Sequence, residues 1–126
     1  MAEEKPAIQD YRDLTVWQEA MTLAEMVYAK TASFPQSETY GLVSQMRRSA
    51  VSTPSNIAEG FGRAQRKPFI QFLRVAQGFL KELETQIELS ARLGFLNQEQ
   101  ASDALKATTL LGKRLVTYVR SLERKT

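Results

Sequence analysis

The side chains with the clearest chemical potential are lysines and arginines that recur at helical spacing. Three of them, Arg63, Arg66 and Lys67, lie close together in a predicted connection. Four more follow at spacings of seven, seven and four residues, which places them on one helix face: Lys106, Lys113, Arg120 and Arg124. Such cations can neutralise the phosphates of a nucleic acid, and binding would then weaken steeply as salt rises. A solvated face that keeps the protein soluble is the simpler interpretation.

A polar stripe runs along the segment before this basic cluster. Its members recur three or four residues apart: Gln45, Arg48, Ser52, Asn56 and Glu59. One interpretation is a recognition surface, with arginine on phosphates and amides on base edges or 2′-hydroxyls. We favour a structural seam that holds a kink at Pro54 or a subunit contact, with Glu59 paired to Arg63. Arg47 points away from this stripe and is a freer candidate for contact with nucleic acid.

The chain contains neither cysteine nor histidine. A disulfide, a zinc site and a Ser-His-Asp group are therefore excluded. Glu84 and Glu88 lie one helical turn apart, but no second acidic pair or histidine completes a site. We expect no catalytic residue, no cofactor and no metal, and we predict that the protein is not an enzyme.

Length and composition fit one folded domain. The chain has 126 residues, of which 43% are hydrophobic and 25% charged. We expect a single domain over residues 1–126, with residues 1–13 as an N-terminal arm. No apolar run of about 18 residues is present, and residues 1–10 lack the apolar stretch of a signal peptide. We therefore expect a cytoplasmic protein without membrane contact.

The net charge of +3 hides a strong segregation of charge along the chain. Residues 39–81 contain seven basic side chains and only one acidic side chain, Glu59. Residues 1–38, in contrast, contain three basic and seven acidic side chains. Charge separated in this way can create a local field that the total conceals.

Hydrophobic periodicity predicts four helices and negligible strand. The first covers residues 15–32, with Thr15 and Gln18 as a capping box and an apolar stripe of Leu14, Trp17, Met21, Ala24 and Val27 or Tyr28. The second begins at residue 37 or 38 and ends at residue 61. The third covers residues 68–93 with Pro68 first, and the fourth opens at Asn97 and Gln100. Trp17 and Tyr40 are candidates for a seam between subunits.

Pro54 interrupts the second helix. Proline removes one backbone hydrogen bond, so we expect a kink near Ala50, with nearby hydroxyls helping to satisfy the freed carbonyl. A true break that gives five helices is the alternative. Gly60 and Gly62 are expected to end this helix, and Gly94 the third. The prediction is an all-α protein: an antiparallel up-down-up-down four-helix bundle with a kinked second helix.

Residues 45–60 resemble the signature of a known family, the four-helix-bundle proteins encoded in intervening sequences of bacterial 23S rRNA genes, also labelled S23 ribosomal proteins. The matching residues are Gln45, Arg47, Arg48, Ser52, Pro54, Asn56, Ile57, Ala58, Glu59 and Gly60. Ser49 and Thr53 stand where the family usually has alanine and isoleucine. Matches at residues 11–17, 34–40, 69–84 and 93–96 extend the resemblance over nearly the whole chain.

This resemblance implies ring-like homopentamers and a relation to the accessory proteins of diversity-generating retroelements, which assist a reverse transcriptase and bind nucleic acid. Our leading hypothesis is therefore a non-enzymatic, homo-oligomeric protein that contacts nucleic acid, RNA before DNA, through its basic residues. The alternative is a homo-oligomeric scaffold or adaptor that binds another protein, such as a reverse transcriptase, without recognising nucleic acid directly.

Overall fold

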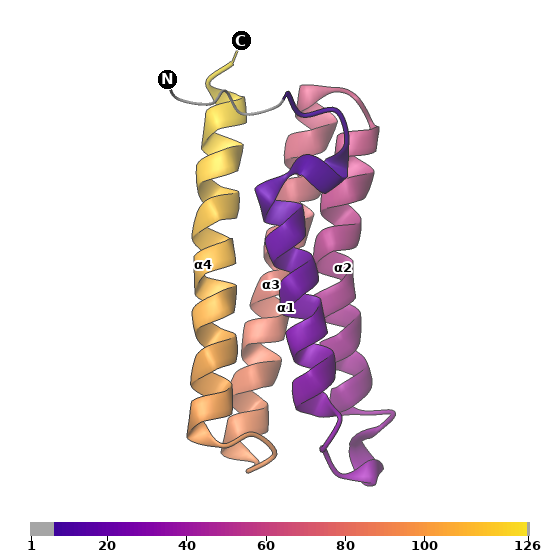
Figure 1. The fold of residues 1–126 in the computed structure, drawn as a ribbon, viewed down its shortest axis with the longest axis vertical. Coiled ribbons are helices and arrows are strands. Elements are labelled where there is room, and N and C mark those ends of the chain that lie inside the picture. Colours follow the sequence, from indigo (N-terminus) through magenta and orange to yellow (C-terminus); the bar gives the residue numbers. More distant parts are fainter. Residues whose placement is uncertain (1–6, 126) are drawn as a thin grey trace.

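The computed structural model describes residues 7–125, which form four long α-helices and no strand. The long helices are α1 (Thr15–Thr31), α2 (Leu42–Gly62), α3 (Arg66–Arg92) and α4 (Gln98–Glu123). α1 and α3 each pack against both α2 and α4. The chain runs down α1, up α2, down α3 and up α4 in the view of Figure 1. The predicted all-α class and the four helices are confirmed.

The core of the bundle follows the predicted rhythm most closely in α3. Its buried residues alternate at spacings of four and three along the whole helix: Phe69, Leu73, Ala76, Leu80, Leu83, Ile87 and Ser90. Such a pattern keeps one face of the helix against its neighbours. Gly94 ends this helix region with a φ of 81°, and Asn97 and Gln100 form the predicted capping box of α4.

The apolar stripe predicted for α1 is only partly right. The buried residues of α1 are Val16, Ala20, Leu23, Ala24, Val27 and Thr31. Met21 and Tyr28 are exposed instead, and Trp17 is partly buried. This helix is apolar on two neighbouring sides, so its periodicity fits two stripes. The predicted stripe included Trp17, Met21 and Tyr28, which lie on the side of the helix that does not face the core.

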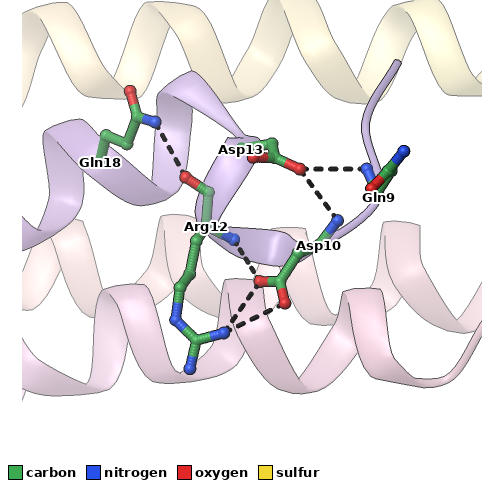
Figure 2. A network of polar contacts seen from close by, with 5 residues as sticks. All are labelled: Gln9, Asp10, Arg12, Asp13 and Gln18. Carbon is green, nitrogen blue, oxygen red and sulfur yellow. Dashed lines mark hydrogen bonds and ion pairs between the residues drawn. The ribbon is translucent and has the colours of Figure 1, made fainter. Parts of the chain in front are cut away.

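The N-terminus of α1 is organised by a short 3-10 helix, η1 (Tyr11–Asp13), which packs against α1 and α2. Asp10 and Asp13 form its capping box (Figure 2). The capping box predicted for Thr15 and Gln18 is wrong, because the Gln18 amide donates to the carbonyl of Arg12 over 2.8 Å. The expected arm thus has a folded segment at its end, while residues 1–6 lie outside the described residues.

α2 begins later than predicted and is continuous through Pro54. Residues Gln36–Glu38 form a second 3-10 helix, η2, and the Glu38 carboxylate accepts a hydrogen bond from the Leu42 N–H. The alternative of five helices is therefore wrong. The Thr53 hydroxyl donates to the carbonyl of Ser49, not to that of Ala50, which Pro54 deprives of its helical donor. The bend expected near Ala50 stays a prediction.

α2 ends at Gly62, as predicted, but neither Gly60 nor Gly62 adopts the left-handed conformation expected of a glycine cap. Gly60 lies inside the helix and is buried against α3. A Cβ at Gly60 would lie 2.4 Å from the Cβ of Phe72, so glycine is required here by close helix packing. The left-handed residue of the α2–α3 turn is Ala64, with a φ of 59°. Pro68 is correspondingly the third residue of α3 and not the first.

Candidate nucleic-acid interface

Basic side chains of α3 and α4 share one outer face of the bundle, the α3–α4 face. On α3, Arg74 forms an ion pair with Glu123 of α4 at 2.7 Å. Further along α3, Glu84 accepts hydrogen bonds from Lys81 of α3 and from Thr108 of α4. These contacts place the cations of α3 on the side of that helix that faces α4.

One end of this face collects most of the candidate residues. The α2–α3 turn and the C-terminal half of α4 lie at the same end of the bundle (Figure 1). Phe69, which follows the turn, packs edge-on against Tyr118 of α4 with ring centroids 5.6 Å apart. The members of this basic end come from the α2–α3 turn, from the first residues of α3 and from the end of α4: Arg63, Arg66, Lys67, Arg120 and Arg124. Backbone topology therefore gathers side chains that are up to 61 positions apart in the sequence.

The candidate cations differ in whether a carboxylate already neutralises them. Arg63 pairs with Glu59 at 3.1 Å, and its guanidinium lies 5.1 Å from the centre of the Phe72 ring. Within residues 7–125 no carboxylate lies within ion-pair distance of six other candidates: Arg66, Lys67, Lys106, Lys113, Arg120 and Arg124. Unpaired, exposed cations are the ones that can release counterions when they meet phosphate.

Arg47 is more constrained than the sequence suggested. Its Nε donates to the Thr31 hydroxyl over 3.0 Å, and its guanidinium lies 4.4 Å above the ring of Tyr28. These contacts fix Arg47 across the α1–α2 seam. A helix-face argument missed them because they depend on how α1 packs against α2.

The predicted polar seam on α2 divides into two parts. Asn56 donates to the carbonyl of Ser52 over 2.7 Å, and Glu59 forms the expected ion pair with Arg63. Gln45 and Arg48 are exposed. Asn56 and Glu59 thus make contacts with residues close in sequence. A role of Gln45 and Arg48 in a subunit contact stays a prediction.

Lys106 and Lys113 lie away from the basic end. Together with Glu88 they line a groove of about 710 Å³ between the end of α3 and the first half of α4. Apolar side chains form much of its lining: Ala91, Leu96, Ala101, Leu105 and Leu110. Along α4, the face that carries these lysines therefore has apolar neighbours in the first half of the helix. At the end of the helix it carries Arg120 and Arg124.

The opposite outer face of the bundle, the α1–α2 face, exposes apolar and aromatic side chains, with Arg47 and Arg48 beside them. A groove of about 630 Å³ there is lined by Trp17, Met21 and Tyr28 of α1 and by Val51 and Pro54 of α2. Tyr40, next to this groove in the α1–α2 connection, is 96% exposed. Aromatic and apolar side chains in solvent are typical of protein interfaces. The prediction included Trp17 and Tyr40 and missed Val51.

Three further findings concern the chemistry of the described residues. Residues 7–125 contain no cluster of three or more acidic side chains placed to hold a metal ion. Burial raises the pKa of Tyr118 above its ordinary value of 10.0, in a contact with Phe69 that serves packing. None of the helices in this part of the chain is long and apolar enough to cross a membrane.

Comparison with known proteins identifies a family to which the sequence is similar. Residues 12–117 match the family described as 23S rRNA-intervening sequence protein. A crystal structure of a protein of unknown function from the S23 ribosomal protein family of Bacteroides thetaiotaomicron VPI-5482 has a similar fold, with a TM-score of 0.75. It is 23% identical in sequence, and the alignment covers 83% of this chain and 98% of that one. No curated protein matches the sequence.

Proposed function

Since this chain belongs to the 23S rRNA-intervening sequence protein family, we propose that it is a non-enzymatic, homo-oligomeric protein that binds RNA through its basic end. The observation that carries this proposal is the convergence of the α2–α3 turn with the last turns of α4. Four of the cations gathered there have no carboxylate partner in the described part of the chain: Arg66, Lys67, Arg120 and Arg124.

The chemistry of this end suits phosphate better than base edges. Arginine presents a planar fork of N–H groups that matches phosphate oxygens, and lysine adds a mobile point charge. Phe69 packs against Phe61 and Tyr118 within the bundle, so its ring is engaged in protein contacts. We therefore expect recognition of RNA by shape and charge, with little dependence on base sequence.

Homo-oligomerisation is the second half of the proposal. The α1–α2 face exposes apolar and aromatic side chains over two neighbouring helices, and burying them against another copy would stabilise an assembly. In a closed ring, cyclic symmetry places the basic ends of all copies on the same rim. Several modest phosphate-binding patches would then act on one RNA at high effective concentration.

Binding of the purified protein to a labelled, structured RNA at about 50 and about 150 mM salt tests this function. We expect tight binding at the lower salt that falls steeply at the higher one, because several cations displace counterions. The absence of binding even at low salt would contradict the proposal. It would leave the basic end as a solvated surface.

A second candidate function is an adaptor that binds another protein and touches nucleic acid little. The apolar grooves on both outer faces favour it. Recovery of a specific partner that survives nuclease treatment would favour this function over RNA binding. Loss of the partner after nuclease treatment would assign the association to RNA.

A further inference from the structure

Two of the six phenylalanines lie outside the core of the bundle. The other four belong to the core or pack against it, and each forms an aromatic pair there: Phe34, Phe61, Phe69 and Phe95. Phe72 and Phe79 are partly exposed and form no aromatic pair within residues 7–125. Their rings therefore have apolar surface that a flat ligand can cover.

The two rings stand on one side of α3, along its seam with α2. Phe72 and Phe79 are seven residues apart, which is two helical turns or about 10.5 Å along the axis. Phe72 is anchored against α2, because a Cβ at Gly60 would lie 2.4 Å from the Phe72 Cβ and 3.2 Å from its Cγ. The lack of a side chain at Gly60 thus gives the Phe72 ring its place at the seam.

Phe72 adjoins the basic end. The guanidinium of Arg63 lies 5.1 Å from the centre of the Phe72 ring, and Arg63 also pairs with Glu59 at 3.1 Å. Arg66 and Lys67 follow in the first turn of α3 and have no ion pair in the described residues. The ring thus stands next to cations that can bind the phosphates of a nucleic-acid strand.

The sequence around the two rings is basic. Residues 60–81 contain no acidic side chain and five basic ones: Arg63, Arg66, Lys67, Arg74 and Lys81. The carboxylates nearest in sequence are Glu59, which Arg63 neutralises, and Glu82, one turn past Phe79. Val75 is the only exposed large apolar side chain between the two rings. Aromatic rings among cations, with little apolar surface around them, favour nucleic acid over another protein as the occupant.

We propose that Phe72 and Phe79 form a stacking platform for unpaired bases of an RNA whose phosphates bind the basic end. This inference rests on the proposed RNA binding and names the part of the RNA that is recognised, a single-stranded loop or end. The rings are farther apart than the rise of about 3.4 Å between neighbouring bases, so each contacts a different base. Stacking tolerates any base, since every base has a π face, which agrees with recognition that depends little on sequence.

The platform assigns Arg63 a role different from that of the other cations at this end. Its charge is already neutralised by Glu59, so it has less to gain from a phosphate than Arg66 or Lys67. Its guanidinium is held beside the Phe72 ring, and guanidinium planes also stack on bases. Arg63 therefore extends the platform, whereas the unpaired cations bind the backbone.

Two RNAs separate stacking from charge: a hairpin with an unpaired loop that contains the fluorescent base 2-aminopurine, and a blunt duplex with the same number of phosphates. Phe72→Leu keeps a Cβ and a Cγ over Gly60 and removes the aromatic ring, while Phe72→Tyr keeps the ring. Phe95→Leu is the matched control, because Phe95 is also partly exposed but packs against Phe34. Circular dichroism and thermal unfolding check the fold of each variant, and light scattering checks its mass.

We expect Phe72→Leu to lose affinity for the hairpin at least about fivefold, with the duplex affinity and the salt slope unchanged, because stacking releases no counterions. Phe79→Leu should show the same selective loss. The loop fluorescence should be quenched more strongly by the wild type than by either variant. Phe72→Tyr and Phe95→Leu should bind both RNAs as the wild type does.

Three results would overturn the platform. The first is a folded Phe72→Leu that binds the hairpin as tightly as the wild type. The second is an equal loss of affinity for hairpin and duplex, and the third is a changed mass of the variant, which would assign the ring to a contact between proteins. A wild type that binds neither RNA is a distinct outcome, which would overturn the proposed RNA binding and the platform with it.

Discussion

The α1–α2 face and the α3–α4 face are built from the same kind of amphipathic helix, yet they leave different side chains in solvent. On the first, Trp17, Met21, Tyr28 and Val51 surround an apolar groove. On the second, the cations of α4 continue past a groove into a basic end that the α2–α3 turn completes. The buried stripes determine the bundle, whereas the exposed residues decide what each face can bind. Function in this protein must therefore be sought on the surface of the helices and not in the core.

Salt should separate the two faces more than any other condition. Contacts with phosphate depend on counterion release, so an interface of about six contacts loses roughly a thousandfold in RNA affinity between about 50 and 200 mM salt. Apolar contacts between copies are not weakened in this way. We expect gel filtration to show an unchanged assembly over the same range in which anisotropy shows RNA release. If the assembly dissociates over the same salt range as the RNA, the contact between copies is also electrostatic, which would contradict the expected difference between the two faces.

The next largest effect concerns the α2–α3 contact, which joins the two faces. Gly60→Ala would place a Cβ 2.4 Å from that of Phe72, so the helices must separate and the free energy of unfolding should fall by about 1–3 kcal/mol. Gly78→Ala is the control, because no atom lies within 4 Å of the added Cβ on α3. It should stabilise the helix by about 1 kcal/mol. Equal effects in urea unfolding would contradict the close-packing account.

A smaller, stabilising effect is expected in the turn between the two faces. Ala64 adopts a left-handed conformation that costs a residue with a Cβ about 1–2 kcal/mol. Ala64→Gly removes this cost but adds entropy to the unfolded chain, so we expect a gain of about 0.5–1 kcal/mol in unfolding free energy. Urea unfolding measures it, and a loss of stability would show that the turn does not hold Ala64 in this conformation.

The smallest effect is a dependence on high pH that belongs to α4. Burial raises the pKa of Tyr118 in the folded protein, so the unfolded chain loses this proton first as the pH rises. Its contribution to stability is complete below the ordinary pKa of 10.0 and is lost as the pH rises through the folded pKa. Tyr118→Phe should show a shallower decline in unfolding free energy above pH 10 than the wild type. Identical pH profiles would contradict this assignment.

Much of the fold could be predicted because local patterns and tertiary packing agree in the second half of the chain. α3 follows an uninterrupted spacing of four and three, and Gly94, Asn97 and Gln100 mark the turn that leads into α4. Each of these patterns is compatible with a single arrangement: one buried face of α3, and one position for the turn. α1 has two apolar sides, so its periodicity could not decide which side faces the core.

The parts that could not be predicted depend on contacts between distant residues. The requirement for glycine at position 60 comes from Phe72 on another helix, and Arg47 is held by Tyr28 and Thr31 of α1. The sequence singled out the cations of the candidate site by type and spacing. It contained no signal that the groove lined by Leu105 and Leu110 separates Lys106 and Lys113 from the basic end.

The salt dependence of RNA affinity in two double variants tests the central claim most directly. Arg120→Gln with Arg124→Gln removes two charges from the basic end. Lys30→Gln with Arg92→Gln removes two charges from the last turns of α1 and α3, at the opposite end of the bundle. We predict that the first variant loses affinity at least about tenfold and that its salt slope falls by about two, while the second binds nearly as the wild type. Equal losses in the two variants, or no loss in the first, would contradict the assignment of RNA binding to the basic end.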